Sequence, residues 1–324
     1  MAVPLLERIR NFILTRRDIA QRSPLVYNVR EYTQSEFLRN FMKMIVAPFV
    51  YLSTFFHRKI SVDDREGLAF VLIAKNEAPY IEEWINFHHK QGASHFFIYD
   101  NESTDNLREV LTPYIEQGLV TYKLIKGKRR QLDAYNMAVH DYGRKFRYMA
   151  VIDADEFVYV RDENYREKGF NLYEFVDDFM KSHENAGGIA INWCIFGSNG
   201  HITKPEGNVL ENYTMCSEKD FSPNLFIKTI CDPLKVRYYG DPHFPVYLKG
   251  FYNLGEDGEI VRISVSKKVN VSKIRINHYF TKSREEYTLK KNRGKADRDD
   301  LRTMEDFYGH DQNIIHDTEI LSRI

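Results

Sequence analysis

Three carboxylates occur within four residues at the end of an apolar run, in the sequence VIDADEF of residues 151–157. Asp153 and Asp155 stand at positions i and i+2, so both can face one ion if the strand ends at this point. Carboxylate oxygens are the ligands that hard divalent cations prefer, and phosphate oxygens of a ligand would complete the coordination. The same pattern also forms turns exposed to solvent, with Asp155 as a helix cap. The pattern follows the fourth predicted strand of a sheet, and this position favours the ion site.

Two other segments carry groups that could bind a ligand. The acidic turn YDNESTDN (residues 99–106) contains Asp100, which could accept a hydrogen bond from a base or a ribose, or could simply form the turn. The basic segment KGKRR (residues 126–130) brings Lys128, Arg129 and Arg130 to the start of a predicted helix. Cations there oppose the helix dipole unless an anion is bound. A solvated basic loop is the alternative.

These segments lie between predicted strands and helices that alternate regularly along the chain. LAFVLIA (residues 68–74) is a continuous apolar run of the kind buried in a parallel sheet. Further strands are predicted in HFFIYD, LVTYKLI and FRYMAVIDADEF, and helices after Asn76, over about residues 106–117 and over about residues 130–142. The alternation predicts a doubly wound α/β half-domain.

In such sheets, ligands bind beyond the carboxyl ends of the strands. The polar residues at these ends are Lys75, Asn76, Glu77, Asp100, Asn101, Lys126, Lys128, Asp153 and Asp155, with Arg129 and Arg130 directly after the third end. The first strand is followed by neither G-x-G-x-x-G nor a P-loop, which disfavours dinucleotide and P-loop nucleotide sites. We therefore expect the edge to bind phosphate by other means, with a metal ion as the obvious one.

The charge balance and the cysteines of the chain indicate which binding partners and which cell compartment to expect. Among 324 residues, 46 are basic and 46 acidic, so no overall field attracts nucleic acid, and we expect no nucleic-acid partner. The three cysteines, Cys194, Cys216 and Cys231, have no metal-ligand spacing and fit a reduced compartment. We therefore expect a cytoplasmic protein; the sequence does not indicate its oligomeric state.

The later motifs carry a family resemblance. IAKNEAPYIEEW, IYDNESTDN and VIDADEF resemble the nucleotide-binding half of GT-A-fold glycosyltransferases of the family-2-like type. NWCIFGSNG, LENYT, FIKTI, PHF and INHYFTKSREEYTLKKNRG resemble family 92 glycosyltransferases and their bacterial relatives. The resemblance covers about residues 68–297. It implies an α/β GT-A fold: a doubly wound, mainly parallel sheet flanked by helices.

The domain boundaries follow from this resemblance. Residues 65–324 form the glycosyltransferase domain, with residues 65–160 as the nucleotide-binding half and residues 161–324 as the acceptor and catalytic half. Residues 1–64 lie outside the resemblance, and their sequence predicts a helical extension. Its apolar segment MIVAPFVYLSTFF is shorter than the roughly 20 residues of a membrane span. It is either a buried helix or an interfacial one, through which residues 39–59 would contact the inner face of the membrane.

What the resemblance implies is transfer of a sugar from a nucleotide-sugar donor, with Mn²⁺ or Mg²⁺ bridging the diphosphate at Asp153 and Asp155. A histidine from late in the chain, His243 or His278, would add a metal ligand. The cations expected to neutralise the donor phosphates are Lys228, Lys282 and Arg293, although Lys228 could merely lie at a strand edge.

Inverting transfer also needs a carboxylate base that accepts the proton of the acceptor hydroxyl. Glu211 is the first candidate, with Asp232 and Asp241 behind it. Trp193 and Phe196 would form an apolar platform for a sugar ring in the acceptor, or belong to the core.

The function expected is therefore a metal-dependent, inverting hexosyltransferase that uses a UDP-sugar and a glycan or glycoconjugate acceptor in polysaccharide biosynthesis. One alternative is a non-catalytic protein that binds a sugar nucleotide or glycan. Another is a sugar nucleotidyltransferase, but that class carries a glycine-rich loop and a basic motif after its first strand, and IAKNEAPY has neither. The donor sugar, the linkage and the stereochemistry stay open.

Overall fold

The computed structural model describes residues 64–292 and 302–324, together with residues 41, 45, 48 and 52. Arg293, and nearly all of the predicted N-terminal extension with its candidate membrane segment, lie outside the described residues. Within the described residues, no helix has the length and apolar character needed to cross a membrane.

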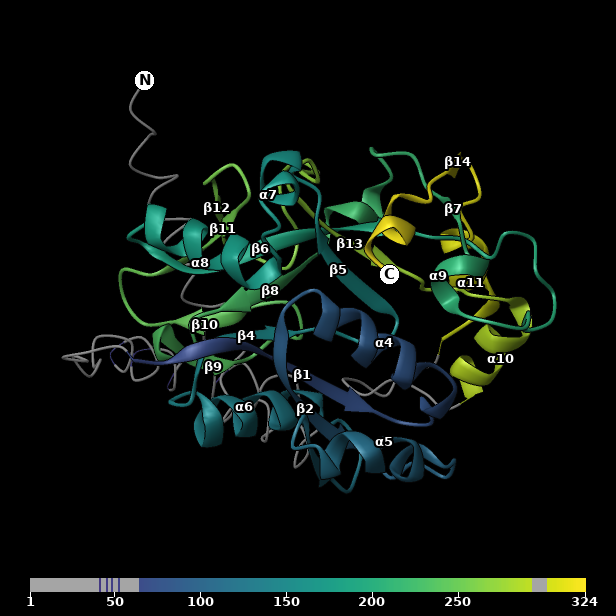
Figure 1. The fold of residues 1–324 in the computed structure, drawn as a ribbon, viewed down its shortest axis with the longest axis horizontal. Coiled ribbons are helices and arrows are strands. Elements are labelled where there is room, and N and C mark those ends of the chain that lie inside the picture. The colour runs from purple at the N-terminus through teal and green to yellow at the C-terminus, as the bar shows by residue number, and fades with distance from the viewer. Residues whose placement is uncertain (1–40, 42–44, 46–47, 49–51, 53–63, 293–301) are drawn as a thin grey trace.

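A ten-stranded mixed sheet forms the centre of the molecule (Figure 1). Its main strand order is β12-β11-β6-β8-β4-β1-β2-β3, and β13 pairs with both β5 and β6. These strands are β1 (Glu66–Ala74), β2 (Ala93–Asp100), β3 (Val120–Leu124), β4 (Phe146–Val151), β5 (Glu156–Val160), β6 (Ala186–Ile195), β8 (Ile227–Cys231), β11 (Tyr252–Gly255), β12 (Ile260–Val261) and β13 (Ile274–His278). Two small sheets pair β9 (Val236–Tyr239) with β10 (Pro245–Tyr247), and β7 (Met215–Cys216) with β14 (Ile315–His316).

Helices cover both faces of this sheet. The helices of the described residues are α4 (Ala78–Lys90), α5 (Leu107–Glu116), α6 (Gln131–Tyr142), α7 (Glu163–Glu167), α8 (Leu172–Ser182), α9 (Val209–Asn212), α10 (Arg284–Asn292) and α11 (Met304–His310), with short 3-10 turns at Ser222–Leu225, Pro233–Lys235 and Glu319–Arg323. Alternate residues of β1 face opposite cores: Phe70 packs with the α4 and α5 side, and Val71 with the α6 side. The α9, α10 and α11 helices gather at one end of the molecule (Figure 1).

The first half of the chain folds as its sequence predicts. Strands β1 to β4 alternate with α4, α5 and α6, and β1 pairs in parallel with both β2 and β4. The α/β class with a mainly parallel sheet is therefore confirmed. The two predicted halves of the domain share this one sheet, because β6, β8 and β11 continue it beyond β4.

The predicted fourth strand is interrupted within VIDADEF. β4 ends at Val151 and β5 begins at Glu156, whose N–H donates to the Asp153 carbonyl at 3.0 Å. The indole N–H of Trp84 donates to the carbonyls of both Asp153 and Glu156, each at 3.0 Å. The chain turns here because β5 leaves the neighbours of β4 and pairs with β13.

The loops at the carboxyl edge are fastened to one another. Asn76 has a left-handed backbone (φ 55°), and its side-chain oxygen accepts the Thr104 N–H at 2.7 Å. Asp105 accepts the N–H of Ala78, the first residue of α4, at 3.0 Å. The turn after β2 therefore fixes the turn after β1, so the polar groups of this edge sit on a rigid frame.

Beneath the edge, His88 of α4 is completely buried. Its Nδ1 donates to the Trp84 carbonyl at 2.9 Å, and its Nε2 accepts the Val158 N–H at 3.2 Å. Both nitrogens of the neutral ring are thus satisfied, and burial lowers the pKa of His88 to about 3. A proton on Nε2 would break the bond to β5 and place a charge in an aromatic core.

We predict that His88 makes the fold sensitive to acid. The pKa of His88 in the folded state lies below the ordinary value of 6.5, so above about pH 6.5 the group does not lower the free energy of unfolding. Below it the unfolded state binds the extra proton, and the free energy of unfolding falls by about 1.4 kcal/mol per pH unit. Denaturant titrations between pH 7 and pH 5 should give His88→Gln a correspondingly shallower pH slope than the wild type. Equal slopes would contradict this account.

Candidate functional site

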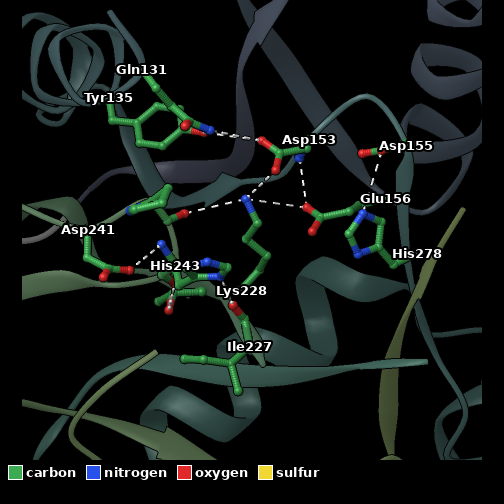
Figure 2. Close-up of polar contacts among 12 residues, drawn as sticks. Gln131, Tyr135, Asp153, Asp155, Glu156, Ile227, Lys228, Asp241, His243 and His278 are labelled. Carbon is green, nitrogen blue, oxygen red and sulfur yellow. Dashed lines mark hydrogen bonds and ion pairs between the residues drawn. The ribbon is translucent and has the colours of Figure 1, made fainter. Parts of the chain in front are cut away.

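The ammonium of Lys228 connects β8 to the turn after β4 (Figure 2). It donates to Asp153 Oδ2 at 2.7 Å, lies 3.6 Å from Glu156 Oε2, and reaches the Pro242 carbonyl at 3.4 Å. Burial alone would lower the pKa of Lys228, but the charges of Asp153 and Glu156 raise it well above its usual value. Lys228 is therefore a buried cation that holds two of the three VIDADEF carboxylates.

Asp153 itself is held from two sides. Its second oxygen, Oδ1, faces Gln131 Nε2 and the Tyr135 hydroxyl of α6, both at 3.3 Å. Its backbone N–H donates to Glu156 Oε2 at 2.8 Å. Glu156 is fully buried, which raises the pKa of this carboxyl to about 8 despite the opposing charge of Lys228.

Asp155 faces the other way, toward the second half of the chain. Its Oδ2 lies 2.5 Å from the ammonium of Lys290 on α10 and 3.6 Å from Nε2 of His278, the last residue of β13. Burial would raise the pKa of Asp155, yet Lys290, His278 and Lys282 together hold it well below its usual value. Burial lowers the pKa of Lys290 to about 8, although Asp155 opposes this shift. Near neutral pH both partners of the pair are therefore charged.

Aromatic rings adjoin this pair. The Trp193 ring lies edge-on to His278 with 4.3 Å between centroids, and stacks on Phe226 at 5.3 Å. His243 completes the group, 5.4 Å from Trp193, and its Nδ1 lies 2.9 Å from the Ile227 carbonyl. Burial lowers the pKa of both histidines, so this group of rings beside the acidic turn is uncharged.

Asp241 lies on the loop that closes this side of the site. Its Oδ1 accepts the backbone N–H of His243 at 2.9 Å, and the neighbouring Pro242 carbonyl contacts Lys228. A further bond, from the Thr229 hydroxyl to the His243 carbonyl at 2.9 Å, fixes the loop to β8. Asp241 is thus a partly exposed carboxylate at the border of the cluster (Figure 2).

The candidate metal ligands separate into two sets. The 3.6 Å between Asp155 Oδ2 and His278 Nε2 leaves room for one ion bound by both at roughly 2.0–2.2 Å. A carboxylate with an imidazole suits Mn²⁺ better than Mg²⁺, which prefers an all-oxygen shell. Asp153 is engaged by Lys228 instead, and His243 bonds the Ile227 carbonyl through Nδ1, a bond that does not involve its Nε2.

The residues that the structure describes do not complete a metal site by themselves. Within residues 64–292 and 302–324, no group of three or more His, Cys, Asp and Glu side chains is placed to hold an ion. Asp155 and His278 nevertheless fit a divalent cation as two ligands, so oxygens of a bound ligand and of water would complete the shell.

Several predicted donor-binding residues lie at this edge, and some of them also make bonds within its turns. Asp100 accepts the Ser103 N–H at 2.9 Å and the Tyr122 hydroxyl at 2.6 Å, as a turn-forming aspartate does. Arg130 bonds Asp133 in the first turn of α6 at 2.7 Å. Lys75, Asn76, Glu77 and Arg129 follow strands β1 and β3 at this same edge, and Lys282 places its ammonium 3.2 Å from the centre of the Tyr80 ring.

Three predicted residues are not part of the cluster. Asp232 lies at the opposite end of the sheet, because β8 runs antiparallel to β4, and it pairs with Arg65 at 3.0 Å. Phe196 is fully buried against Tyr279, so it belongs to the core and offers no surface to a sugar. Glu211 is exposed on the short α9 helix and makes no described contact with the cluster.

Other residues of the cluster were missed. Lys290 could have been found from helical spacing, because it stands one turn after Glu286 on the buried face of α10. Gln131 and Tyr135 also stand one turn apart, at the start of α6, and the Gln131 amide donates to the Tyr135 hydroxyl at 2.7 Å. Glu156 belongs to the motif itself, but its role depends on Lys228, which comes from a distant strand.

Curated relatives match limited parts of the chain. A glycosyltransferase family 92 protein of Ricinus communis is 25% identical over 142 residues, which is 43% of this chain and 24% of the relative. A galactan beta-1,4-galactosyltransferase of Arabidopsis thaliana is 38% identical over 90 residues, which is 25% of this chain and 17% of the relative. The chain thus spans a quarter or less of the length of these relatives.

Among solved structures, S. aureus TarS (residues 1–349) in complex with UDP is similar over 52% of this chain and 47% of that chain, with a TM-score of 0.33 and 14% identity.

The family comparison reaches much further along the chain. The sequence model of glycosyltransferase family 92 matches residues 72–310. This range begins in β1 and includes Asp153, Asp155, Lys228, His278 and Lys290. The resemblance carried by the motifs is thereby confirmed: this chain belongs to glycosyltransferase family 92.

Proposed function

We propose that the protein is a metal-dependent glycosyltransferase that moves a hexose from a nucleoside diphosphate sugar to a glycan or glycoconjugate acceptor, with inversion, in polysaccharide biosynthesis. The observation that carries the proposal is the facing pair Asp155 and His278 beside the Trp193 ring. A metal ligand pair next to an aromatic side chain suits a ligand that joins a diphosphate to a sugar. Membership of the family supports the same reaction class.

The donor would lie across the carboxyl edge, with its diphosphate toward Asp155 and His278. A bound Mn²⁺ there would stabilise the negative charge that develops on the departing diphosphate. Lys228 and Lys290 add positive charge on either side of the turn. Uridine diphosphate is the carrier expected from the family resemblance, and the Arabidopsis relative makes UDP-galactose the first donor to test.

Asp241 is the better placed of the candidate bases. It borders the cluster on a loop fixed to β8, whereas Glu211 is exposed on α9 and Asp232 lies at the far end of the sheet. In inverting transfer, a carboxylate in this position accepts the proton of the acceptor hydroxyl as oxygen attacks the anomeric carbon.

Contact of residues 39–59 with a membrane surface stays a prediction. It concerns a segment of which only residues 41, 45, 48 and 52 are described.

We predict that UDP with Mn²⁺ stabilises the protein in a thermal-shift assay by about 2.7 kcal/mol at about a hundredfold excess over Kd. Asp155→Asn should abolish the part of the shift that depends on Mn²⁺. Asp141→Asn is the matched control, because Asp141 pairs with Lys123 at the other end of α6 and should keep the full shift. The proposal would be contradicted if UDP raised the melting temperature by the same amount with Mn²⁺, without Mn²⁺ and in Asp155→Asn. That result would favour a non-catalytic binding protein.

For the base, we predict that Asp241→Asn lowers kcat by at least about 100-fold, the usual contribution of general base catalysis, and leaves UDP binding unchanged. Glu211→Gln should retain most of the activity. Steady-state kinetics with UDP-galactose or whichever donor is active, together with UDP titrations, measure both quantities. The opposite ranking of the two variants would transfer the role to Glu211.

A further inference from the structure

The Lys290 side chain is aimed at Asp155 by its own helix. One turn earlier on α10, Glu286 accepts hydrogen bonds from the Tyr80 hydroxyl at 2.8 Å, the Ser283 hydroxyl at 2.5 Å and the Tyr213 hydroxyl. These bonds tie α10 to α4 and to the segment after α9. The rotation of α10 is therefore fixed, and residue 290 faces inward on the same side as residue 286.

The ammonium of Lys290 is enclosed by the protein. It donates to Asp155 Oδ2 at 2.5 Å and to the Phe280 carbonyl at 2.8 Å, and it lies 4.4 Å from the centre of the Phe280 ring. The pair is largely buried, with each side chain 13% exposed, so it is screened far less than a surface ion pair.

Lys290 and a metal ion would compete for the same atom. Asp155 Oδ2 is both the oxygen that Lys290 holds and the oxygen that faces His278 Nε2. An ion between Asp155 and His278 would stand close to the ammonium, and two cations repel strongly in a buried site. Asp155 and Lys290 together are neutral, so the protein alone offers the metal little net charge. A nucleoside diphosphate changes this balance, because its phosphates give Lys290 another partner.

We propose that Lys290 is a resident counter-ion of Asp155, which it yields to the divalent cation only when a donor diphosphate is present to receive the ammonium. This rests on the proposed function of the site. Lys290 thereby makes metal binding and donor binding cooperative, since each ligand removes an obstacle to the other. Without the donor, Lys290 weakens metal binding; with the donor, it pairs with the diphosphate.

The test measures Mn²⁺ binding directly, by titration followed with electron paramagnetic resonance, with and without UDP. Lys290→Gln should bind Mn²⁺ alone about tenfold tighter than the wild type, which corresponds to roughly 1.4 kcal/mol. UDP should tighten Mn²⁺ binding strongly in the wild type and much less in this variant. Lys290→Arg keeps the positive charge and should retain weak binding of Mn²⁺ alone, which separates the charge effect from damage to folding.

Lys181→Gln is the matched control, because Lys181 is exposed on α8 and pairs with Asp177. It should bind Mn²⁺ as the wild type does. Equal or weaker binding of Mn²⁺ to Lys290→Gln overturns the proposal, and so does a wild type that binds no Mn²⁺ even with UDP. Sugar transfer by the wild type, measured with and without chelator, shows whether the proposed function fails as well. If transfer persists in chelator, the role of Lys290 is overturned but glycosyl transfer itself is not.

Discussion

The buried ammonium of Lys228 is the constraint on which the site depends. A lysine with 1% of its side chain exposed must have anionic partners, because an uncompensated buried charge costs several kcal/mol. Asp153 supplies the close anionic partner at 2.7 Å and the carboxyl of Glu156 lies 3.6 Å away; both come from the turn between β4 and β5. The antiparallel strand β8 must therefore lie beside β4 in the register that brings residue 228 to this turn. The shape of VIDADEF is set by this pairing as much as by its own sequence.

That arrangement leaves Asp155 for a different task. With Asp153 and Glu156 turned toward β8, Asp155 points to β13 and α10, where His278 and Lys290 meet it. In the proposed function, the acidic turn thus has a structural side and a ligand-binding side. The first carboxylate anchors the turn, and the second stays within reach of a cation that can be exchanged. Hydrogen bonds of Asn76 and Asp105 hold the loops around this turn together, which would help the proposed site to position a reacting sugar.

The sequence predicts the first half of the fold well because its information is local. Apolar runs, caps and turns repeat over residues 68–151, and the strands pair with near neighbours. Most of the second half depends on distant pairings that no local pattern reveals, including β8 between β4 and β6 and β13 beside β5. Asp232, a candidate base predicted from its place after the strand IAINWCIFG, shows the effect: it follows Lys228 by four residues, and along an antiparallel strand these carry it away from the edge. Trp193 and Phe196 differ by an odd number of residues, so strand alternation already argues that they cannot share one face.

A crystal structure of the protein with UDP and Mn²⁺ would test the central claim most directly, namely that Asp155 and His278 hold the metal of a donor diphosphate. The account predicts one Mn²⁺ between Asp155 and His278, bridged to both phosphates, with the Lys290 ammonium moved from Asp155 to a phosphate oxygen. It also predicts that Asp153 remains on Lys228. A metal bound to Asp153 instead, or a diphosphate bound away from this edge with the pair of Asp155 and Lys290 intact, would contradict it.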